Sequence, residues 1–308
     1  MFRAKIILIV GVLFSSTVVG HTHYLLSEIA FPCDTDSIAL GNSNIAAAKD
    51  KNAVFGYNPA SVGFVKFPQI KFVSTNLFLD IQGYAASYIH PTIILPPSYG
   101  RLGFGVEFYN LGKVAARSPT GEEVYSYGSS TILSQVVYSM LLHKKFSIGI
   151  SWRAVSSNLE SNRSFGLLSD VGVVYSEVGV YKDVYKLSLG LSIRGVTIAG
   201  LKYLQKSEFI TPQVVFGMNN SFFRNRANFY VAAIYMNNKF FPSYGVEIYP
   251  LQNISLRTGN VFLPLYGNSF RVGCSVEVLR YTVSLSYVNN KKLLSDTFSI
   301  SLSLRFGK

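Results

Sequence analysis

The chain has 308 residues, of which 49% are hydrophobic and 14% charged, against roughly 25% charged residues in ordinary soluble domains. A water-soluble enzyme of this length would need more charge to cover its surface, so the composition disfavours that class. The formal net charge is +12, but Arg and Lys are scattered mostly singly along the chain. This dispersal argues against a nucleic-acid-binding surface.

The first twenty residues have the three parts of a secretory signal peptide. Arg3 and Lys5 precede a short apolar run at residues 6–14, and small residues follow at 15–20. The run is too short to span a bilayer as an anchor, so we predict that residues 1–20 direct export. Cleavage after Gly20 would leave His21-Thr22-His23 at the new terminus. This terminus could chelate Cu(II) or Ni(II), but a mobile end is the favoured interpretation.

Residues 21–69 show little two-residue alternation, and they include Cys33. The second cysteine, Cys274, falls in the alternating apolar run 270–278. An exported chain permits a disulfide, but a cysteine on a lipid-facing strand cannot reach a segment inside or below a barrel. We therefore expect two free or sequestered thiols.

From about residue 70, large apolar side chains alternate with small polar ones, which is the pattern of β-strands with two different faces. The clearest segments are residues 102–108, 146–153, 185–194, 281–287 and 298–306. Twelve to fourteen such strands, each of about ten residues, fit between residues 70 and 308. Turn residues are expected between them at Ser157-Asn158, Asn219-Asn220, Asn237-Asn238 and Asn289-Asn290.

The polar face of these strands is mostly Ser and Gly, whereas a secreted β-sandwich would fill it with Lys, Glu and Asp. The apolar face carries aromatic residues near the strand ends, where membrane interfaces lie. We therefore predict an all-β fold, a transmembrane antiparallel β-barrel of about fourteen strands, with a soluble sandwich as the alternative. Phe306 ends the last strand, close to where barrel-assembly signals end.

Catalytic and metal-binding patterns are weak in this sequence. The four histidines have no zinc-site spacing, and no phosphate-binding glycine motif appears. We expect no enzyme activity, no cofactor and no metal site. Several charged residues fall on the lumen-facing side, where we favour structural ion pairs over a selectivity lining. They are Glu107, Arg153, Lys186, Arg194, Arg271, Glu277 and Arg305.

Residues 39–63 contain Gly41, an Ala-rich turn, Asp50, and Asn58-Pro59-Ala60. This segment resembles the N-terminal region of the PorV/PorQ family, which is itself similar to the FadL/TodX transporters of hydrophobic compounds. Residues 244–248, 254–259 and 298–306 resemble strands of the same family. The resemblance spans most of the chain.

The resemblance implies a fourteen-stranded barrel at residues 70–308, with residues 21–69 folded into its lumen as a hatch. It implies passage of small hydrophobic compounds or a role beside a type IX secretion apparatus. A structural barrel that binds other envelope proteins is the alternative. The expected partners are outer-membrane lipid or lipopolysaccharide, the barrel-assembly machinery, and secretion-system or other envelope proteins; nucleic acid is not among them.

Overall fold

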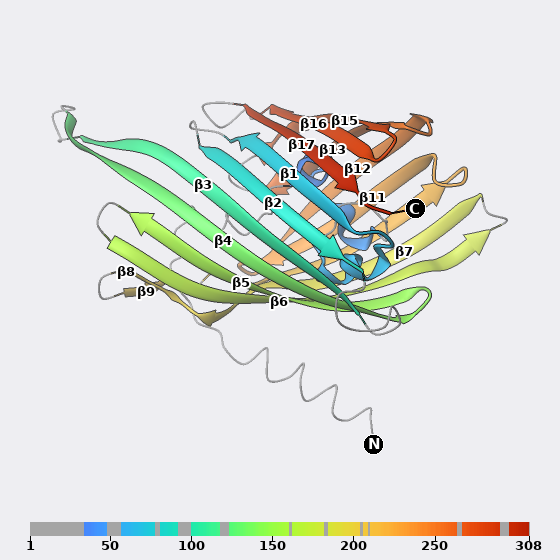
Figure 1. Ribbon diagram of the computed structural model, residues 1–308, viewed down its shortest axis with the longest axis horizontal. Coiled ribbons are helices and arrows are strands. Elements are labelled where there is room, and N and C mark those ends of the chain that lie inside the picture. Colours follow the sequence, from blue (N-terminus) through green and yellow to red (C-terminus); the bar gives the residue numbers. More distant parts are fainter. Residues whose placement is uncertain are drawn as a thin grey trace, which may run out of the picture.

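The structure is a computed structural model of the chain (Figure 1). It describes residues 34–47, 57–77, 81–91, 100–117, 123–159, 162–181, 184–203, 206–208, 210–263, 267–289 and 296–307. The predicted signal peptide, His21, His23, Cys33 and Asp50 lie outside these residues. Within them, no helix is long and apolar enough to cross a membrane.

Fourteen antiparallel strands form one closed ring, which confirms the predicted fold and rules out a two-sheet sandwich. The ring strands in chain order are β1 (Gln69–Asn76), β2 (Gln82–His90), β3 (Arg101–Arg117), β4 (Glu123–His143), β5 (Phe146–Leu159), β6 (Asn162–Tyr181), β7 (Tyr185–Ala199), β10 (Gln213–Phe222), β11 (Ala227–Met236), β12 (Lys239–Leu251), β13 (Ile254–Leu263), β15 (Phe270–Val278), β16 (Tyr281–Asn289) and β17 (Thr297–Arg305).

The remaining elements are short. Strands β8 (Leu201–Tyr203) and β9 (Lys206–Glu208) form a separate two-stranded sheet, and β14 (Gly267–Asn268) pairs beside β13. Before β1 lie helix α3 (Thr35–Ala39) and two 3₁₀ turns, η1 (Asn44–Ala46) and η2 (Pro59–Phe64). These three blue elements lie within the ring in Figure 1 and contact its strands from the inside.

The first and last strands close the ring. Strand β1 pairs with β17 over eight residues, from Gln69 opposite Arg305 to Asn76 opposite Phe298. Closure leaves no open strand edge, whose unpaired backbone groups would each cost several kcal/mol in hydrocarbon. The ring therefore satisfies its own backbone hydrogen bonds.

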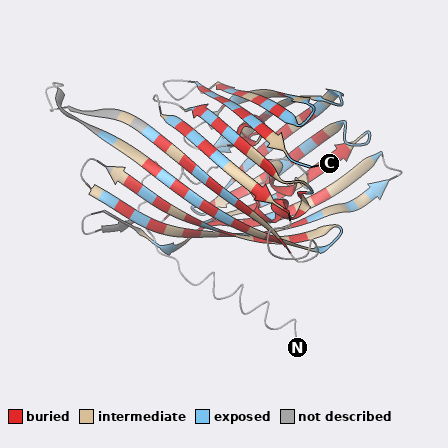
Figure 2. Ribbon diagram, in the orientation of Figure 1, coloured by how far each residue is buried: buried red, intermediate tan, exposed pale blue. Residues whose placement is uncertain are grey.

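The two faces of the wall differ as the sequence predicts, and buried and exposed residues alternate along the strands (Figure 2). In β17, Phe298, Ile300 and Leu302 are 42–49% exposed, whereas Ser299 and Ser301 are at most 2% exposed. The large apolar side chains therefore point outward and the serines inward. Such a surface suits contact with bilayer hydrocarbon.

Two bands of outward aromatic residues mark the ends of this apolar surface. We call the end where β1 begins and β17 ends the terminal end, and the opposite end the loop end. At the terminal end the exposed aromatics include Tyr175, Tyr181, Phe223 and Tyr281. At the loop end they include Tyr84, Phe240, Phe270, Tyr287 and Phe298. These bands match the interfacial girdles of membrane barrels.

The connections also distinguish the two ends. At the terminal end, several strands are joined by tight turns such as Lys144-Lys145 and Leu279-Arg280, whereas the β2–β3 connection at this end spans residues 91–100. At the loop end, residues 200–212 join β7 to β10, and the β3–β4 hairpin extends far beyond the ring at the upper left of Figure 1. Membrane barrels have short periplasmic turns and longer extracellular loops, and the tight turns of the terminal end resemble the former.

Two of the four predicted turns are wrong. Ser157-Asn158 lies in β5 and Asn219-Asn220 in β10, because strand pairing with the neighbouring strands extends through these residues. Asn220 accepts a hydrogen bond from the Tyr185 hydroxyl at 2.8 Å, and Asn219 points into the lumen and is buried.

The turn predicted at Asn237-Asn238 is confirmed: both residues lie in the turn between β11 and β12, with φ of 52° and 59°. Asn289 is the last residue of β16, and Asn290 lies outside the described residues. On β15, Cys274 is a free thiol.

Candidate functional site

The inner wall of the barrel carries a belt of glycines that contacts the N-terminal segment, by which we mean the described residues 34–47 and 57–64. The belt consists of one glycine on each of seven strands: Gly149, Gly172, Gly190, Gly217, Gly245, Gly259 and Gly273. At each of them, an added Cβ would come within 3.0 Å of an atom in residues 39–60. A side chain at any of these positions would therefore force the segment to shift.

The Asn58 side chain makes hydrogen bonds both to the barrel wall and to other residues of the N-terminal segment. Its side-chain amide donates hydrogen bonds to the carbonyl of Ile45 at 3.1 Å and to the carbonyl of Val173, in β6, at 2.9 Å. Its oxygen accepts from the amide of Ala60 at 3.0 Å and so caps η2, in which Pro59 is the first residue. The Asn-Pro-Ala motif is thus buried where the segment meets β5 and β6.

Gly41, another residue of the predicted motif, lies in the N-terminal segment and contacts a different part of the wall. It has φ of +63°, and an added Cβ there would meet the backbone of Asn260. Its carbonyl accepts a hydrogen bond from the Ser243 hydroxyl on β12. A residue with a side chain would therefore be both strained and obstructed at this position.

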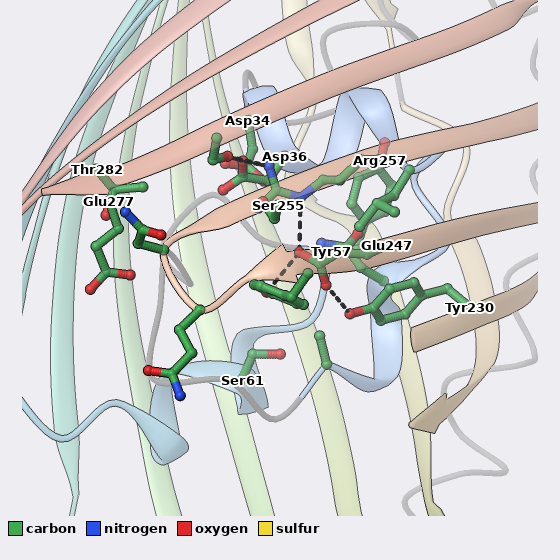
Figure 3. A pocket seen from close by; sticks show the side chains of 17 residues that line it. Asp34, Asp36, Tyr57, Ser61, Tyr230, Glu247, Ser255, Arg257, Glu277 and Thr282 are labelled. Atoms are coloured by element: carbon green, nitrogen blue, oxygen red, sulfur yellow. Dashed lines mark hydrogen bonds and ion pairs between the residues drawn. The ribbon is translucent and has the colours of Figure 1, made fainter. Parts of the chain in front are cut away.

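Ion pairs attach helix α3 to the opposite part of the wall (Figure 3). Asp34 caps the helix by accepting from the amide of Ser37 at 3.0 Å, and it also pairs with Lys71 of β1. Asp36 lies 2.8 Å from Arg257 of β13. The helix is therefore bound by charge to two strands as well as by packing.

Arg257 extends this network to β12, because its Nε donates to Glu247 at 2.9 Å. Glu247 is 1% exposed and also accepts from the hydroxyls of Tyr230 and Tyr249, each at 2.9 Å. These groups line a polar pocket at the terminal end of the lumen (Figure 3). Its carboxylates are saturated by partners within the protein, which argues against a free cation site.

The predicted lumen-facing charges lie on the inner side of the wall in separate groups. Arg153 pairs with Asp170 at 2.6 Å, and Lys186 pairs with Glu177 at 2.6 Å. On β15 and β17, Glu277 pairs with Arg305.

The other three make hydrogen bonds or ring contacts. Glu107 accepts from the Tyr109 hydroxyl at 2.5 Å. Arg271 donates to the carbonyl of Ile38, in α3, at 3.4 Å. Arg194 lies over the ring of Tyr57, 4.5 Å from its centroid. Burial raises the pKa of the Tyr57 phenol well above its ordinary value, so this ring is neutral.

Sequence reasoning missed the charged residues that hold α3. Lys71 stands in the first strand among apolar neighbours, and Asp34 and Asp36 precede the barrel. Glu247 and Arg257 stand in the two segments that resemble PorV/PorQ strands. Glu247 and Arg257 carry opposite charges and face each other on neighbouring strands. An acidic and a basic residue on consecutive predicted strands are the sequence signal that could have identified them.

The inner wall is less uniformly polar than the sequence predicts, because two buried apolar clusters lie on it. The first joins Val62 and Val65 to residues of β1–β6, and the second joins Ile45 and Tyr57 to residues of β10–β13. Simple alternation concealed them because inward and outward neighbours are both apolar. Val137, for example, is fully buried, whereas Val136 is 38% exposed.

Buried apolar residues occur on the loop-end side of the glycine belt, together with buried charged residues such as Arg153 and Asp170. In five strands, a buried apolar side chain lies on the loop-end side of the belt glycine: Val155, Leu168, Val215, Phe241 and Val261. Toward the terminal end, by contrast, the inward residues include Ser147, Asn219, Glu247 and Arg257. The N-terminal segment thus lies next to a part of the lumen where apolar side chains are buried beside charged ones.

The fold and its inner segment define a closed membrane-type barrel with its N-terminal region inside. No protein-family model and no curated protein sequence matches the chain. Among solved structures, the toluene transporter TodX of Pseudomonas putida is similar, with a TM-score of 0.59 and 12% identity over 88% of this chain and 96% of TodX.

A FadL homologue of Pseudomonas aeruginosa has a TM-score of 0.56 and 9% identity, over 90% of this chain and 99% of that one. The monoaromatic hydrocarbon channel CymD has a TM-score of 0.58 and 13% identity, over 89% and 100%. At these identities the likeness establishes the shared fold, a fourteen-stranded barrel of the FadL/TodX type.

Proposed function

We propose that this protein is an outer-membrane channel for small hydrophobic molecules, with residues 21–69 as its hatch. The observation that carries the proposal is the set of buried apolar side chains on the loop-end side of the glycine belt, such as Val155, Val215 and Phe241. The charged residues Arg153 and Asp170 on the same side are paired with each other. An apolar molecule entering from the loop end would meet a surface that favours it, at roughly 25 cal/mol per Å² of apolar area removed from water.

The N-terminal segment stands in the way of such a molecule. Residues 39–46 and 58–60 touch the belt on seven strands, so the lumen is occupied at this level. Passage therefore requires the segment to move. The hydrogen bonds of Asn58 and the ion pairs of α3 are the contacts that hold it closed.

The chemistry of the similar solved structures supports the same substrate class. TodX is described as a toluene transporter and CymD as a monoaromatic hydrocarbon channel. The ion pairs of Arg153, Lys186, Glu277 and Arg305 support it as well, since paired charges do not form a row of one sign that would select ions. We extend the proposal to export by residues 1–20, residence in the outer membrane, and insertion by the barrel-assembly machinery.

Membership of the PorV/PorQ family and a role beside a type IX secretion apparatus are supported by the sequence resemblance alone. We place that role, and a structural barrel that binds envelope proteins, second to passage. The buried apolar clusters on the inner wall decide the order, because protein binding at the rim would need no apolar interior.

Uptake by intact cells tests the proposal. Cells that express the chain should take up radiolabelled toluene faster than cells without it, with sucrose uptake unchanged. Leu133 belongs to the inner apolar cluster, so Leu133→Gln should reduce toluene uptake and Leu133→Met should preserve it. Equal toluene uptake with and without the chain, or sucrose uptake that rises in parallel, would contradict the proposal.

A further inference from the structure

Basic residues gather in three tight turns at the terminal end. Lys144 and Lys145 join β4 to β5, Arg224 and Arg226 lie between β10 and β11, and Arg280 lies between β15 and β16. These turns contain no acidic residue. Lys145 lies 3.9 Å from Glu177. The other four are exposed and, in the part of the chain that the structure describes, take part in no ion pair.

The three turns are spread around the ring. Four strands, β5, β6, β7 and β10, separate the first turn from the second, and four more, β11, β12, β13 and β15, separate the second from the third. A globular partner would contact one sector of the rim. A lipid leaflet, by contrast, surrounds the whole barrel and meets all three turns at once.

A large apolar side chain is also exposed in each turn or, for the first turn, near the end of the preceding strand β4. Leu142, Phe223 and Leu279 are 53%, 65% and 89% exposed. Phe223 and Leu279 have φ of 52° and 57°, a left-handed conformation that is uncommon for residues with bulky side chains. Apolar tips next to cations are typical of segments that lie at the boundary between headgroups and acyl chains.

We propose that these turns bind anionic glycerophospholipids of the leaflet at the terminal end, with Lys144, Arg224, Arg226 and Arg280 on the headgroup phosphates. Leu142, Phe223 and Leu279 insert at the upper acyl chains. Arg can engage a phosphate through two parallel N–H donors, and cations near an anionic surface are attracted to it. The inference rests on the membrane placement in the proposed function and is independent of hydrocarbon passage.

Native mass spectrometry of the full, delipidated chain tests the inference. Phosphatidylglycerol and phosphatidylcholine with the same acyl chains are the probes, and their relative retention is the readout. We expect a clear preference for phosphatidylglycerol. In Arg224→Gln/Arg226→Gln this preference should fall about fivefold for each cation removed. Leu279→Ser should reduce retention of both lipids.

The matched control is Arg163→Gln/Lys239→Gln, two exposed basic residues at the loop end, which should keep the preference. Heat-modifiable gel mobility checks that each variant is a folded barrel.

Equal retention of the two lipids by the native chain would overturn the inference. So would loss of the preference in excess inorganic phosphate, which would indicate a free-anion site. Binding of poly-glutamate without a lipid preference would indicate an acidic protein partner instead. Toluene uptake is measured separately. It distinguishes a failure of this inference from a failure of the channel proposal.

Discussion

The guanidinium of Arg257 lies between two carboxylates from different parts of the chain, Asp36 of the inner helix at 2.8 Å and Glu247 of the neighbouring strand at 2.9 Å. Both distances are those of strong charge-assisted hydrogen bonds. Through this one side chain, the N-terminal segment and the barrel wall share a buried charge. Removing it should affect the stability of the barrel and the seating of the segment together.

Arg257→Met should destabilise the barrel by about 3–5 kcal/mol, because it leaves Glu247 buried without its cation and leaves Asp36 with Lys71, 3.5 Å away. Urea unfolding in lipid vesicles measures the change. The triple variant Asp36→Asn/Glu247→Gln/Arg257→Met should recover most of the loss, since no charge is then left unpaired. An unfolding midpoint for Arg257→Met equal to that of the native chain would show that these ion pairs contribute little to stability.

Gly172→Val should displace the Asn-Pro-Ala motif. A Cβ at Gly172 would overlap the side chains of Asn58 and Pro59, and overpacking of this kind costs about 1–3 kcal/mol. We expect a lower unfolding midpoint and a larger single-channel conductance in planar bilayers. The control on the same strand is Gly179→Val, where the nearest atom to a new Cβ is 3.7 Å away. Similar unfolding midpoints and conductances for the two variants would argue against a role of the glycine belt in positioning the segment.

Leu302→Arg should impair membrane assembly. Leu302 is 44% exposed on the outer face of β17, and a cation on the lipid face costs about 2–4 kcal/mol at the bilayer midplane. Leu302→Phe keeps an apolar side chain at the same place and should assemble normally. The fraction of heat-modifiable protein in vesicles is the measurement. Full assembly of the Arg variant would mean that this face does not meet hydrocarbon.

Much of the barrel could be predicted from the sequence because its signal is local. Two-residue alternation follows directly from strand geometry, and it identified β17, β16 and the first ten residues of β7 with the correct faces. Paired asparagines misled at Asn219-Asn220, since strand pairing with β7 and β11 extends through both residues.

The contacts of the inner segment could not be predicted in this way. Helix α3 has five residues, too few for a periodic pattern, and its ion pairs join positions such as Asp36 and Arg257 that are far apart in the chain. The glycine belt is likewise invisible locally, because each of its glycines comes from a different strand. Only closure of the ring brings them to one level.

The most direct test of the account is whether passage requires the N-terminal segment to move. The hydroxyls of Thr35 in α3 and Ser299 in β17 lie 2.8 Å apart, which makes them a suitable pair for a disulfide between inner helix and wall. The variant Thr35→Cys/Ser299→Cys, with Cys33 and Cys274 replaced by Ser, is assayed for toluene uptake oxidised and reduced. We expect the oxidised form to block uptake and the reduced form to restore it. Equal uptake in both forms, with the disulfide verified, would contradict a moving hatch.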